Sequence, residues 1–501
     1  MKTNRVIKIF LASSEELEAD RYRFGNLIRK LDNIYEKRGI RIELFEWEDY
    51  DAAYNGMRKQ DEYNERVRAS DMFLALFHKK AGKFTIEEFN IARKAFDEQA
   101  SPKIYTYIKD LEAGESESRE LAEFKRLMLE ELGHYWCRYS NFDTMQLHFV
   151  LQLQMVEATT PIKVEVKESQ MKIGDSTIAD LNNVPFTSEN ATHRELQSRK
   201  EQLDREIGNA ESGGRRGFFG QRSRMTDEEL ANLREERESL TEQIERQEKA
   251  LVDTAMSIAR MQGGECSPRM RTAAELFEKG EIDKAEAVLK EDDMEADATN
   301  AKLKFDTAAQ PTAELTRNIE QCAGEYMLKA RIVVSGIADE SRYRQAVKLM
   351  STAIDLVSGR LPEETLAEYL FDYAVLLTDT GQQTKALETW ERLSGIYERL
   401  YRKAPQKYAY GYAGVLNNMA VLYSDKGDFD HCLSKYLKAV DIYDRLDREE
   451  PGIYDDDIAR LKNNLGTLYS DRDEYNKALS EFNEAARIRF ELLAKDNDPD
   501  S

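Results

Sequence analysis

The sequence predicts a multi-domain protein in which an α/β domain with a parallel sheet precedes a largely all-α remainder. Three observations predict this class. Short apolar runs alternate with helical stretches over the first third of the chain, leucines recur at coiled-coil spacing in the middle, and one pattern repeats every 46 residues near the end. The predicted segments are an α/β domain over 1–160, a β connector over 161–187, an antiparallel helical hairpin over 188–262 and a helical repeat array over 263–495.

The first segment alternates strand and helix. Val6–Ala12 is an apolar run closed by two serines, and apolar residues at helical spacing follow from Glu15 to Arg38. Met72–Phe77 is apolar throughout, which is typical of a strand covered on both faces. The other expected elements are strands at Ile40–Phe45, Lys103–Ile108 and Tyr135–Tyr139, and helices at Glu87–Phe96, at Glu117–Leu132 and after Asn141. Strands joined by helices predict a mostly parallel sheet, whose ligands bind beyond the carboxyl ends of the strands.

The middle of the chain first breaks this pattern and then becomes helical. Alternating residues at Ile162–Val166 and a Gly-Asp turn at Gly174 predict a small β hairpin. From about Thr192 to Gly263, apolar residues at three- and four-residue steps predict two antiparallel helices around a glycine-rich tip at 212–224. The predicted seam consists of Leu196, Leu203 and Ile207 in one arm and Leu230, Leu233, Leu240, Ile244 and Leu251 in the other.

The last segment contains an internal repeat. The repeated positions are Ala374, Gly381, Ala386 and Trp390, then Ala420, Gly427, Cys432 and Tyr436, then Gly466, Asp473, Ala478 and Phe482. Small residues in two successive helices, beside an aromatic residue, let paired helices pack closely and stack. The order small–turn–small–aromatic resembles the tetratricopeptide repeat, with a longer loop between repeats. Tyr343–Ala353 is similar to a further second helix and Gly280–Leu289 to a degenerate one.

The composition excludes several functions. A formal charge of −22 argues against a general nucleic-acid binder, because an acidic surface repels phosphates. No apolar run approaches the roughly 20 residues that cross a bilayer. The five histidines have no ligand spacing and the four cysteines form no CxxC pair. We therefore expect no metal site, reduced thiols and a cytoplasmic location.

The opening of the chain carries a second resemblance. Its motifs are Lys8–Ser14 with Glu16, Asp20-Arg21, Trp47–Asp49, Gly56, Gln60, Asn64, Ser70-Asp71 and Ala81–Phe89. Their order and their placement at strand ends, over roughly the first 110 residues, resemble the TIR-like domains at the N-termini of bacterial signalling and anti-phage proteins. The resemblance implies a flavodoxin-like parallel sheet, self-assembly, and cleavage of NAD at the nicotinamide–ribose bond, with NAD as the substrate rather than as a cofactor.

The resemblance also implies a catalytic glutamate. In catalytic TIR domains this residue lies in a helix after a middle strand and precedes an apolar residue, and Glu88-Phe89 match that pattern, with Glu87 as the neighbouring candidate. A carboxylate suits the chemistry because the glycosidic carbon gains oxocarbenium character, which a nearby anion stabilises. The alternative is an exposed acidic helix start, in which both glutamates complement the helix dipole.

Eight further residues are candidates for substrate binding: Ser13, Ser14, Arg21, Trp47, Glu48, Gln60, Asn64 and Thr85. The two serines end the first strand, where their hydroxyls are suited to hold a phosphate or ribose and to cap the following helix, and the two roles are compatible. Arg21 either reaches a phosphate or pairs with Glu48 or Asp49 at the edge of the core.

The other candidates also have two interpretations. Trp47 follows the second strand and is either a stacking platform or a half-buried core residue. Gln60 and Asn64 are four residues apart and share a helix face, either as pocket lining or as helix surface. Thr85 belongs to the motif that ends at Glu88.

In the repeats, paired asparagines recur and are candidates for partner binding. They are Asn417, Asn418, Asn463 and Asn464, which either bind a peptide backbone in the concave groove or pack the helices. The function we expect is a nucleotide-cleaving effector that works as a homo-oligomer, with the array sensing a protein or peptide partner. The alternatives are a TIR-like module that binds a nucleotide or protein without turnover, and a scaffold in which only the repeats are active.

Overall fold

The computed structural model describes residues 5–36, 39–45, 59–112, 114–131, 136–156, 164–174, 176–212, 226–262, 266–336, 339–449 and 451–496. The chain divides into two compact units. The first comprises Met1–Val156, Ile162–Val288 and Ser335–Ile337, and the second comprises Glu157–Pro161, Leu289–Val334 and Ala338–Ser501. Each unit has its own architecture.

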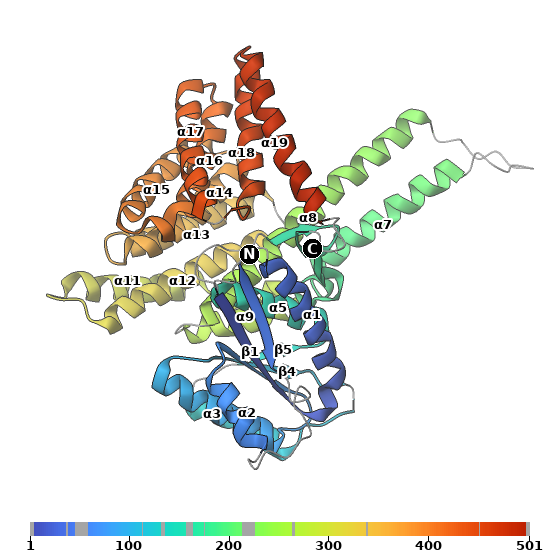
Figure 1. Ribbon diagram of the computed structural model, residues 1–501, viewed down its shortest axis with the longest axis vertical. Coiled ribbons are helices and arrows are strands. Elements are labelled where there is room, and N and C mark those ends of the chain that lie inside the picture. Colours follow the sequence, from blue (N-terminus) through green and yellow to red (C-terminus); the bar gives the residue numbers. More distant parts are fainter. Residues whose placement is uncertain are drawn as a thin grey trace, which may run out of the picture. The chain divides into compact units, whose positions relative to one another are not determined.

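The first unit begins with a five-stranded sheet that is parallel throughout, as the alternation of strands and helices predicts (Figure 1). Its strands are β1 (Arg5–Ser13), β2 (Ile40–Phe45), β3 (Met72–Phe77), β4 (Lys103–Lys109) and β5 (Cys137–Tyr139). Their spatial order is β2-β1-β3-β4-β5, so β1 and β3 are neighbours at the centre. Ser13 pairs with Leu76, which brings the carboxyl ends of these two strands to the same edge of the sheet.

The sheet is covered by helices on both faces. These elements are the 3-10 turn η1 (Glu15–Leu17), α1 (Glu18–Glu36), α2 (Lys59–Arg68), α3 (Lys83–Gln99), α4 (Arg119–Arg126), the π-helical turn η3 (Leu127–Glu131) and α5 (Phe142–Val156). The helix expected at 87–96 therefore starts earlier, at Lys83, and the one expected at 117–132 is divided into α4 and η3.

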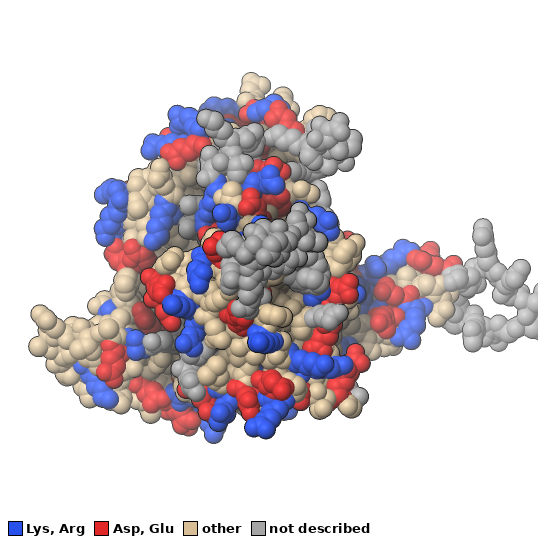
Figure 2. Space-filling model, turned by 60° about the horizontal axis from the view of Figure 1, so that its bottom comes forward, with Lys and Arg blue, Asp and Glu red and all other residues tan. Residues whose placement is uncertain are grey.

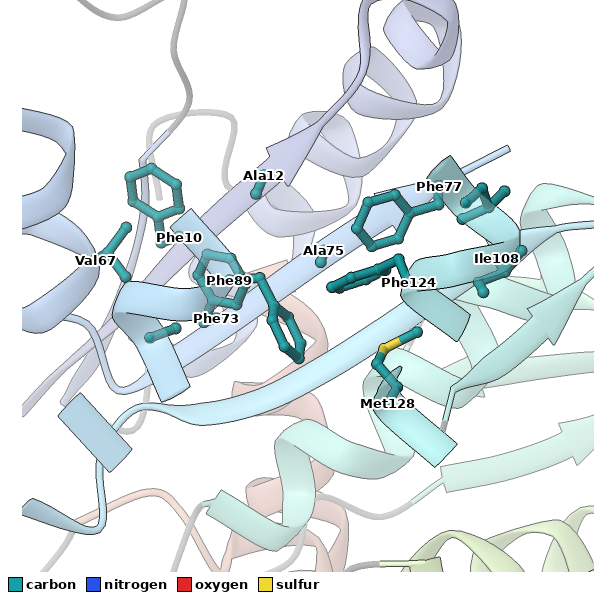
Figure 3. Close-up of a cluster of buried hydrophobic side chains, with 12 residues drawn as sticks. Phe10, Ala12, Val67, Phe73, Ala75, Phe77, Phe89, Ile108, Phe124 and Met128 are labelled. Carbon is teal, nitrogen blue, oxygen red and sulfur yellow. The ribbon is translucent and has the colours of Figure 1, made fainter. Parts of the chain in front are cut away.

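Alternating residues of the strands fill the two faces. Phe73 and Ala75 point to a core that α2, α3 and α4 close, and Phe89 of α3 packs edge to face on Phe124 of α4, with ring centroids 5.0 Å apart (Figure 3). On the opposite face, Phe24 of α1 meets Phe149 of α5 at 4.7 Å. Helices α1 and α3, which follow adjacent strands, thus lie on opposite faces of the sheet.

A second, antiparallel sheet follows. It consists of β6 (Val164–Lys167), β7 (Gln170–Ile173) and β8 (Ser176–Asp180), and it leads into the 3-10 turn η4 (Leu181–Asn183) and α6 (Pro185–Ser188). The sequence predicted a single hairpin here, and the structure has a three-stranded meander instead. Glu168 and Ser169 link β6 to β7 with φ values of 53° and 56°, the left-handed pair that a tight two-residue hairpin turn requires.

The predicted hairpin consists of α7 (Ala191–Ser212) and α8 (Asp227–Gln262), whose arms lie side by side (Figure 1). Its seam contains five of the predicted residues: Leu196, Leu203, Leu233, Leu240 and Ile244. The predicted tip falls on residues that lie outside the described part of the chain, apart from Ser212 at the end of α7. Two further helices, α9 (Pro268–Glu278) and α10 (Ile282–Val288), complete the first unit.

The base of the hairpin encloses a polar cluster. His193 of α7 and Glu248 of α8 are both buried, and His193 Nε2 lies 3.5 Å from Glu248 Oε1. Ser169 donates its hydroxyl to Glu248 Oε1 at 2.6 Å, and Gln247 Oε1 lies 3.3 Å from His193 Nδ1. Burial lowers the pKa of His193 and raises the pKa of Glu248, because the charged form of each group loses hydration there.

The second unit is helical. Its helices are α11 (Glu291–Thr307), α12 (Ala313–Ser335), α13 (Glu340–Val357), α14 (Glu363–Asp379), α15 (Gln383–Lys403), α16 (Pro405–Asp425), α17 (Phe429–Glu449), α18 (Asp455–Asp471) and α19 (Tyr475–Asp496). The last six form three antiparallel pairs, α14 with α15, α16 with α17, and α18 with α19 (Figure 1). This arrangement confirms a tetratricopeptide-like helical array.

The 46-residue period is reproduced in the turns within these pairs. Gly381, Gly427 and Asp473 all have positive φ, at 69°, 72° and 56°. Each donates its N–H to the carbonyl three residues earlier, and the next residue donates to the carbonyl five residues earlier. This pair of bonds is the Schellman ending of a helix, and it occurs again at Gly280 between α9 and α10.

Packing between the paired helices also follows the predicted register. Ala374 and Ala420 are fully buried, and Trp390 and Tyr436 are buried beside them. A Cβ atom placed on Gly466 would lie 2.7 Å from the ring of Phe482, so only glycine permits this contact. The expectation that a small residue of the first helix meets an aromatic residue of the second is confirmed for Gly466 and Phe482, and the corresponding residues of the other two pairs are all buried.

Candidate functional site

The turn that follows β1 is held by a buried arginine. Arg21 of α1 is 1% exposed and donates from Nη1 to Ser13 Oγ at 2.9 Å and to the Ser14 carbonyl at 2.8 Å. A guanidinium buried in this way fixes the direction in which the chain leaves the strand. In this conformation Arg21 is a positioning residue for the two serines, while Ser13 and Ser14 themselves are only half-buried.

Glu16 links this turn to the loop that follows β3. Its Oε1 accepts the N–H of Lys79 at 3.0 Å and the N–H of Lys80 at 3.2 Å, and Ser14 Oγ donates to the same oxygen at 3.3 Å. Glu16 is exposed, so these bonds lie at the surface. They join the turn after β1 to the loop after β3.

The loop after β3 meets a second carboxylate, that of Glu115. Lys79 Nζ forms an ion pair with Glu115, and His78 Nε2 lies 3.3 Å from Glu115 Oε2. Their hydrogen bond raises the pKa of Lys79 and lowers the pKa of Glu115. The donors at the end of β3 are thus directed at acidic side chains of this same chain.

A third polar group joins the first turn of α1 to the ends of β4 and β5. Asp20 is buried, and its Oδ2 accepts Lys109 Nζ at 2.8 Å and the hydroxyl of Tyr139 at 3.0 Å. Burial raises the pKa of Tyr139 well above its usual range, and the neighbouring Asp20 carboxylate adds to the effect. The carboxyl edge of the sheet therefore carries its polar side chains in connected clusters.

Helix α3 contains the glutamates singled out by sequence. Glu88 is 7% exposed and Thr85 is buried as well. Glu87 is less buried, and its Oε1 accepts Asn64 Nδ2 of α2 at 3.4 Å. Because α3 starts at Lys83, both glutamates lie beyond its first turn, which contains no acidic residue. The interpretation of Glu87 and Glu88 as an exposed start that complements the helix dipole is therefore wrong.

Not every predicted residue of this site is described. Trp47 and Glu48, with Asp49, lie outside the described residues, as does the side chain of Gln60. The structure brings together Ser13, Ser14 and Arg21, and it separately links Asn64 to Glu87.

The asparagines of the array are connected to one another. Asn464 Nδ2 donates to Asn417 Oδ1 at 3.3 Å, which joins α18 to α16, and Asn417 Nδ2 lies 3.4 Å from Asn418 Oδ1. Asn417, Asn418, Asn463 and Asn464 are all half-buried. The link between Asn417 and Asn464 favours the packing interpretation for these two residues.

Sequence reasoning assigned no role to six polar residues that lie at this edge of the sheet: Glu16, Asp20, Lys79, Lys109, Glu115 and Tyr139. Glu16 and Asp20 belong to the recognised opening motif, and their acidic character next to the strand end was the available signal. Their partners lie 63 to 119 residues away along the chain, so no local pattern announces them. Within the described ranges, His, Cys, Asp and Glu form no group suited to hold a metal ion.

Across the described part of the chain, every helix is too short or too polar to span a membrane. On the face shown in Figure 2, acidic and basic side chains are intermixed, in spite of the acidic net charge. The net negative charge of the chain therefore does not make this face uniformly acidic.

Comparisons with known proteins give no family. No protein-family model matches the sequence, and no curated protein matches it. Among solved structures, BtubC (BKLC) from P. vanneervenii is 16% identical, with 59% of this chain and 92% of that chain covered and a TM-score of 0.32. Aspartyl phosphate phosphatase F from Bacillus subtilis is 12% identical, with 59% and 82% covered and a TM-score of 0.22.

A third similar structure extends over most of the chain. It is a signal transduction ATPase with numerous domains and a tetratricopeptide repeat sensor, from Pyrococcus horikoshii, at 10% identity, 98% and 90% coverage and a TM-score of 0.23. At these TM-scores the superpositions do not establish a shared fold. The geometry of this chain alone defines its class, an α/β domain of strand order 2-1-3-4-5 followed by tetratricopeptide-like helical repeats.

Proposed function

We propose that the N-terminal domain is TIR-like and cleaves NAD or a related nucleotide at the nicotinamide–ribose bond, with Glu88 as the catalytic carboxylate. The observation that carries the proposal is the burial of Glu88 in the helix that follows the central strand β3. A buried carboxylate is costly to retain unless its surroundings stabilise the charge, and such groups are concentrated at functional sites.

The fold supplies the rest of the proposed site. In a doubly wound sheet of order 2-1-3-4-5, ligands bind where adjacent strands send their helices to opposite faces, which in this chain is between β1 and β3. Ser13 and Ser14 end β1, and the loop that leads to α3 ends β3. In the proposed reaction Glu88 stabilises the positive charge that develops on the ribose carbon as nicotinamide leaves.

The helical array is proposed to bind a protein or peptide partner, and binding is proposed to assemble the protein into a homo-oligomer in which the N-terminal site becomes active. What supports this part is the repeated pairing of helices from α14 to α19; of the asparagines, Asn463 lies outside the bond that joins α18 to α16 and is half-buried. The corresponding biological role is signalling or anti-phage defence in a bacterial cytoplasm.

The test is release of free nicotinamide from NAD by the full chain, alone and with a crowding agent that drives assembly. Glu88→Gln keeps the size of the side chain and removes its charge, so we expect turnover to fall by about a hundredfold or more. Glu87→Gln is the matched control, because a glutamine still accepts the hydrogen bond from Asn64. Equal losses in both variants, or none in either, would show that Glu88 is not the catalytic group.

A second candidate function is nucleotide binding without turnover. The observation that favours it is the set of N–H donors at the end of β3, which suits an anion and requires no catalytic carboxylate. Wild-type protein that binds ADP but releases no nicotinamide from NAD in any assembled state would support this alternative.

A further inference from the structure

The two central strands end at a point where the chain diverges. After β1 the chain turns into α1, which packs with α5 on one face, and after β3 it turns into α3, which packs with α2 and α4 on the other. A crevice at such a point exposes backbone N–H groups that the sheet no longer pairs. The N–H groups of Lys79 and Lys80 are two of them.

Both of these N–H groups are directed at a single anionic oxygen. Glu16 Oε1 accepts Lys79 at 3.0 Å and Lys80 at 3.2 Å, with the Ser14 hydroxyl as a third donor at 3.3 Å. Consecutive backbone N–H groups that converge on one oxygen, together with a hydroxyl, are the means by which loops hold phosphate groups. The Glu16 carboxylate therefore occupies the position of a bound anion.

A cationic side chain and an imidazole lie next to these donors, and both contact the carboxylate of Glu115. The Lys79 ammonium and the His78 ring both lie beside Glu115, whose Oε2 also accepts the N–H of Glu112 at 3.0 Å. Glu16 is exposed and Glu115 belongs to a loop, so neither carboxylate is fixed by burial in the core. Exposed interactions of this kind are weak and exchangeable.

We propose that the donors at the ends of β1 and β3 form a binding site for a phosphate group of a nucleotide, and that Glu16 is an internal competitor which the phosphate displaces. The proposal rests on the function proposed above and names the regulation of that same site. A phosphate brings more charge and more acceptor oxygens than one carboxylate, so it can satisfy the donors at the ends of both strands at once. Lys80 lies three residues before α3, the helix that contains Glu88. The group bound to the Lys80 N–H therefore also determines the conformation of the loop that leads into this helix.

The test is isothermal titration calorimetry of the full chain with three probes: ADP, inorganic phosphate, and adenosine as the ligand without phosphate. Glu16→Gln removes the competing charge but keeps an acceptor oxygen, and we expect it to bind ADP about tenfold more tightly than wild type. Glu18→Gln is the matched control, since it removes the same charge from an exposed position two residues away and should leave the affinity unchanged. If Glu16→Gln also binds inorganic phosphate more tightly, the increase in ADP affinity is due to the phosphate group. If it binds adenosine more tightly, the proposal is contradicted.

A second measurement does not depend on how the variant folds. In wild-type protein labelled with 15N-lysine, the amide signals of Lys79 and Lys80 should shift on addition of ADP, and Lys79→Arg and Lys80→Arg assign them. Unchanged signals, or unchanged ADP affinity in Glu16→Gln, would overturn the proposal even if NAD is cleaved. Tighter ADP binding in Glu16→Gln without nicotinamide release by any form would instead leave the phosphate site standing and remove the proposed hydrolysis, because ADP contains no nicotinamide.

Discussion

The array and the N-terminal unit reach their structures by different means. In the array, three successive helix pairs use the same positions for the same purpose, so a small residue, a left-handed turn and an aromatic residue recur every 46 residues. In the N-terminal unit each important contact occurs once, such as Glu16 with Lys79, and joins residues far apart in the chain. Because the array repeats, its register is visible in the sequence, whereas the contacts at the edge of the sheet each occur once and leave no repeated pattern.

Among single substitutions in the array, the greatest loss of stability is expected at Trp390. The side chain is 1% exposed, packs edge to face on Phe371 at 5.4 Å and donates its indole N–H to Thr378 Oγ1 at 3.2 Å. Trp390→Ala should lower the free energy of unfolding by about 3–5 kcal/mol, because it leaves a large cavity in a buried region. Urea denaturation followed by circular dichroism measures it.

The equivalent residue of the last pair provides the control. Phe482 is only half-buried, so Phe482→Ala should cost less than Trp390→Ala despite the identical place in the repeat. Equal losses at the two positions would mean that the repeats contribute equally whatever their burial.

A second prediction tests the close approach of α18 and α19. Gly466→Ala places a methyl group 2.7 Å from the ring of Phe482, and this overpacking should destabilise the array by about 1–3 kcal/mol. Gly414→Ala is the matched control, since nothing lies within 4 Å of its added methyl group in α16. There the better helix propensity of alanine should raise the stability by about 0.5–1 kcal/mol. A gain at both positions would show that Gly466 is not needed for packing.

The sequence predicts the repeated and strongly apolar parts of the fold better than the parts that lack a local signal. The parallel sheet was predictable because β3 is apolar throughout, and the repeat register because its period is visible by eye. The start of α3 was not, since its N-cap is Gly82, which has no side chain to cap the helix, and Lys83 gives no start signal. The alternation at Ile162–Val166 did indicate β6, but the sequence did not show that this stretch and the strands around Gly174 form three strands rather than one hairpin.

The candidate site was predictable only as far as it is local. Ser13, Ser14 and Arg21 are close in sequence and were all singled out, but the hydrogen bonds from Arg21 to Ser13 and to the Ser14 carbonyl were not predicted. The contact of Asp20 with Tyr139 spans 119 residues and depends on the order of the strands, which a single sequence does not state. A sequence therefore indicates which polar residues follow the ends of strands. Which of these residues contact one another is determined by the order of the strands in the folded sheet.

The buried pair at the base of the hairpin gives a prediction of smaller effect, which depends on pH. Burial lowers the pKa of His193, so below its unfolded value of 6.5 the unfolded chain takes up a proton that the folded chain does not. The stability linked to His193 is thus present above pH 6.5 and is lost as the pH falls. The slope is at most about 1.4 kcal/mol per pH unit.

Glu248 acts in the opposite direction. Burial raises its pKa, so its contribution is present below its unfolded value of 4.5 and is lost as the pH rises through the folded value. Between pH 7.5 and 5.5, His193→Gln should therefore lose less stability on acidification than wild type, and Glu248→Gln should lose at least as much. Urea midpoints at the two pH values measure both. A larger acid loss in His193→Gln would mean that the histidine is charged in the folded protein.

The smallest effect concerns the left-handed turns of the array. Gly381 and Gly427 occupy this conformation without strain, whereas Asp473 holds a side chain at a φ of 56°, which aspartate tolerates better than most residues. Gly427→Ala should cost about 1 kcal/mol, and the loss comes from backbone strain alone because nothing lies within 4 Å of the added methyl group. Asp473→Gly should change the stability by less, since the relief of strain is offset by the greater freedom of glycine in the unfolded chain and by the lost hydrogen bond from the Tyr475 hydroxyl. If Asp473→Gly destabilised the array as much as Gly427→Ala does, the turns would not be equivalent, and the repeat would end at the second helix pair rather than the third.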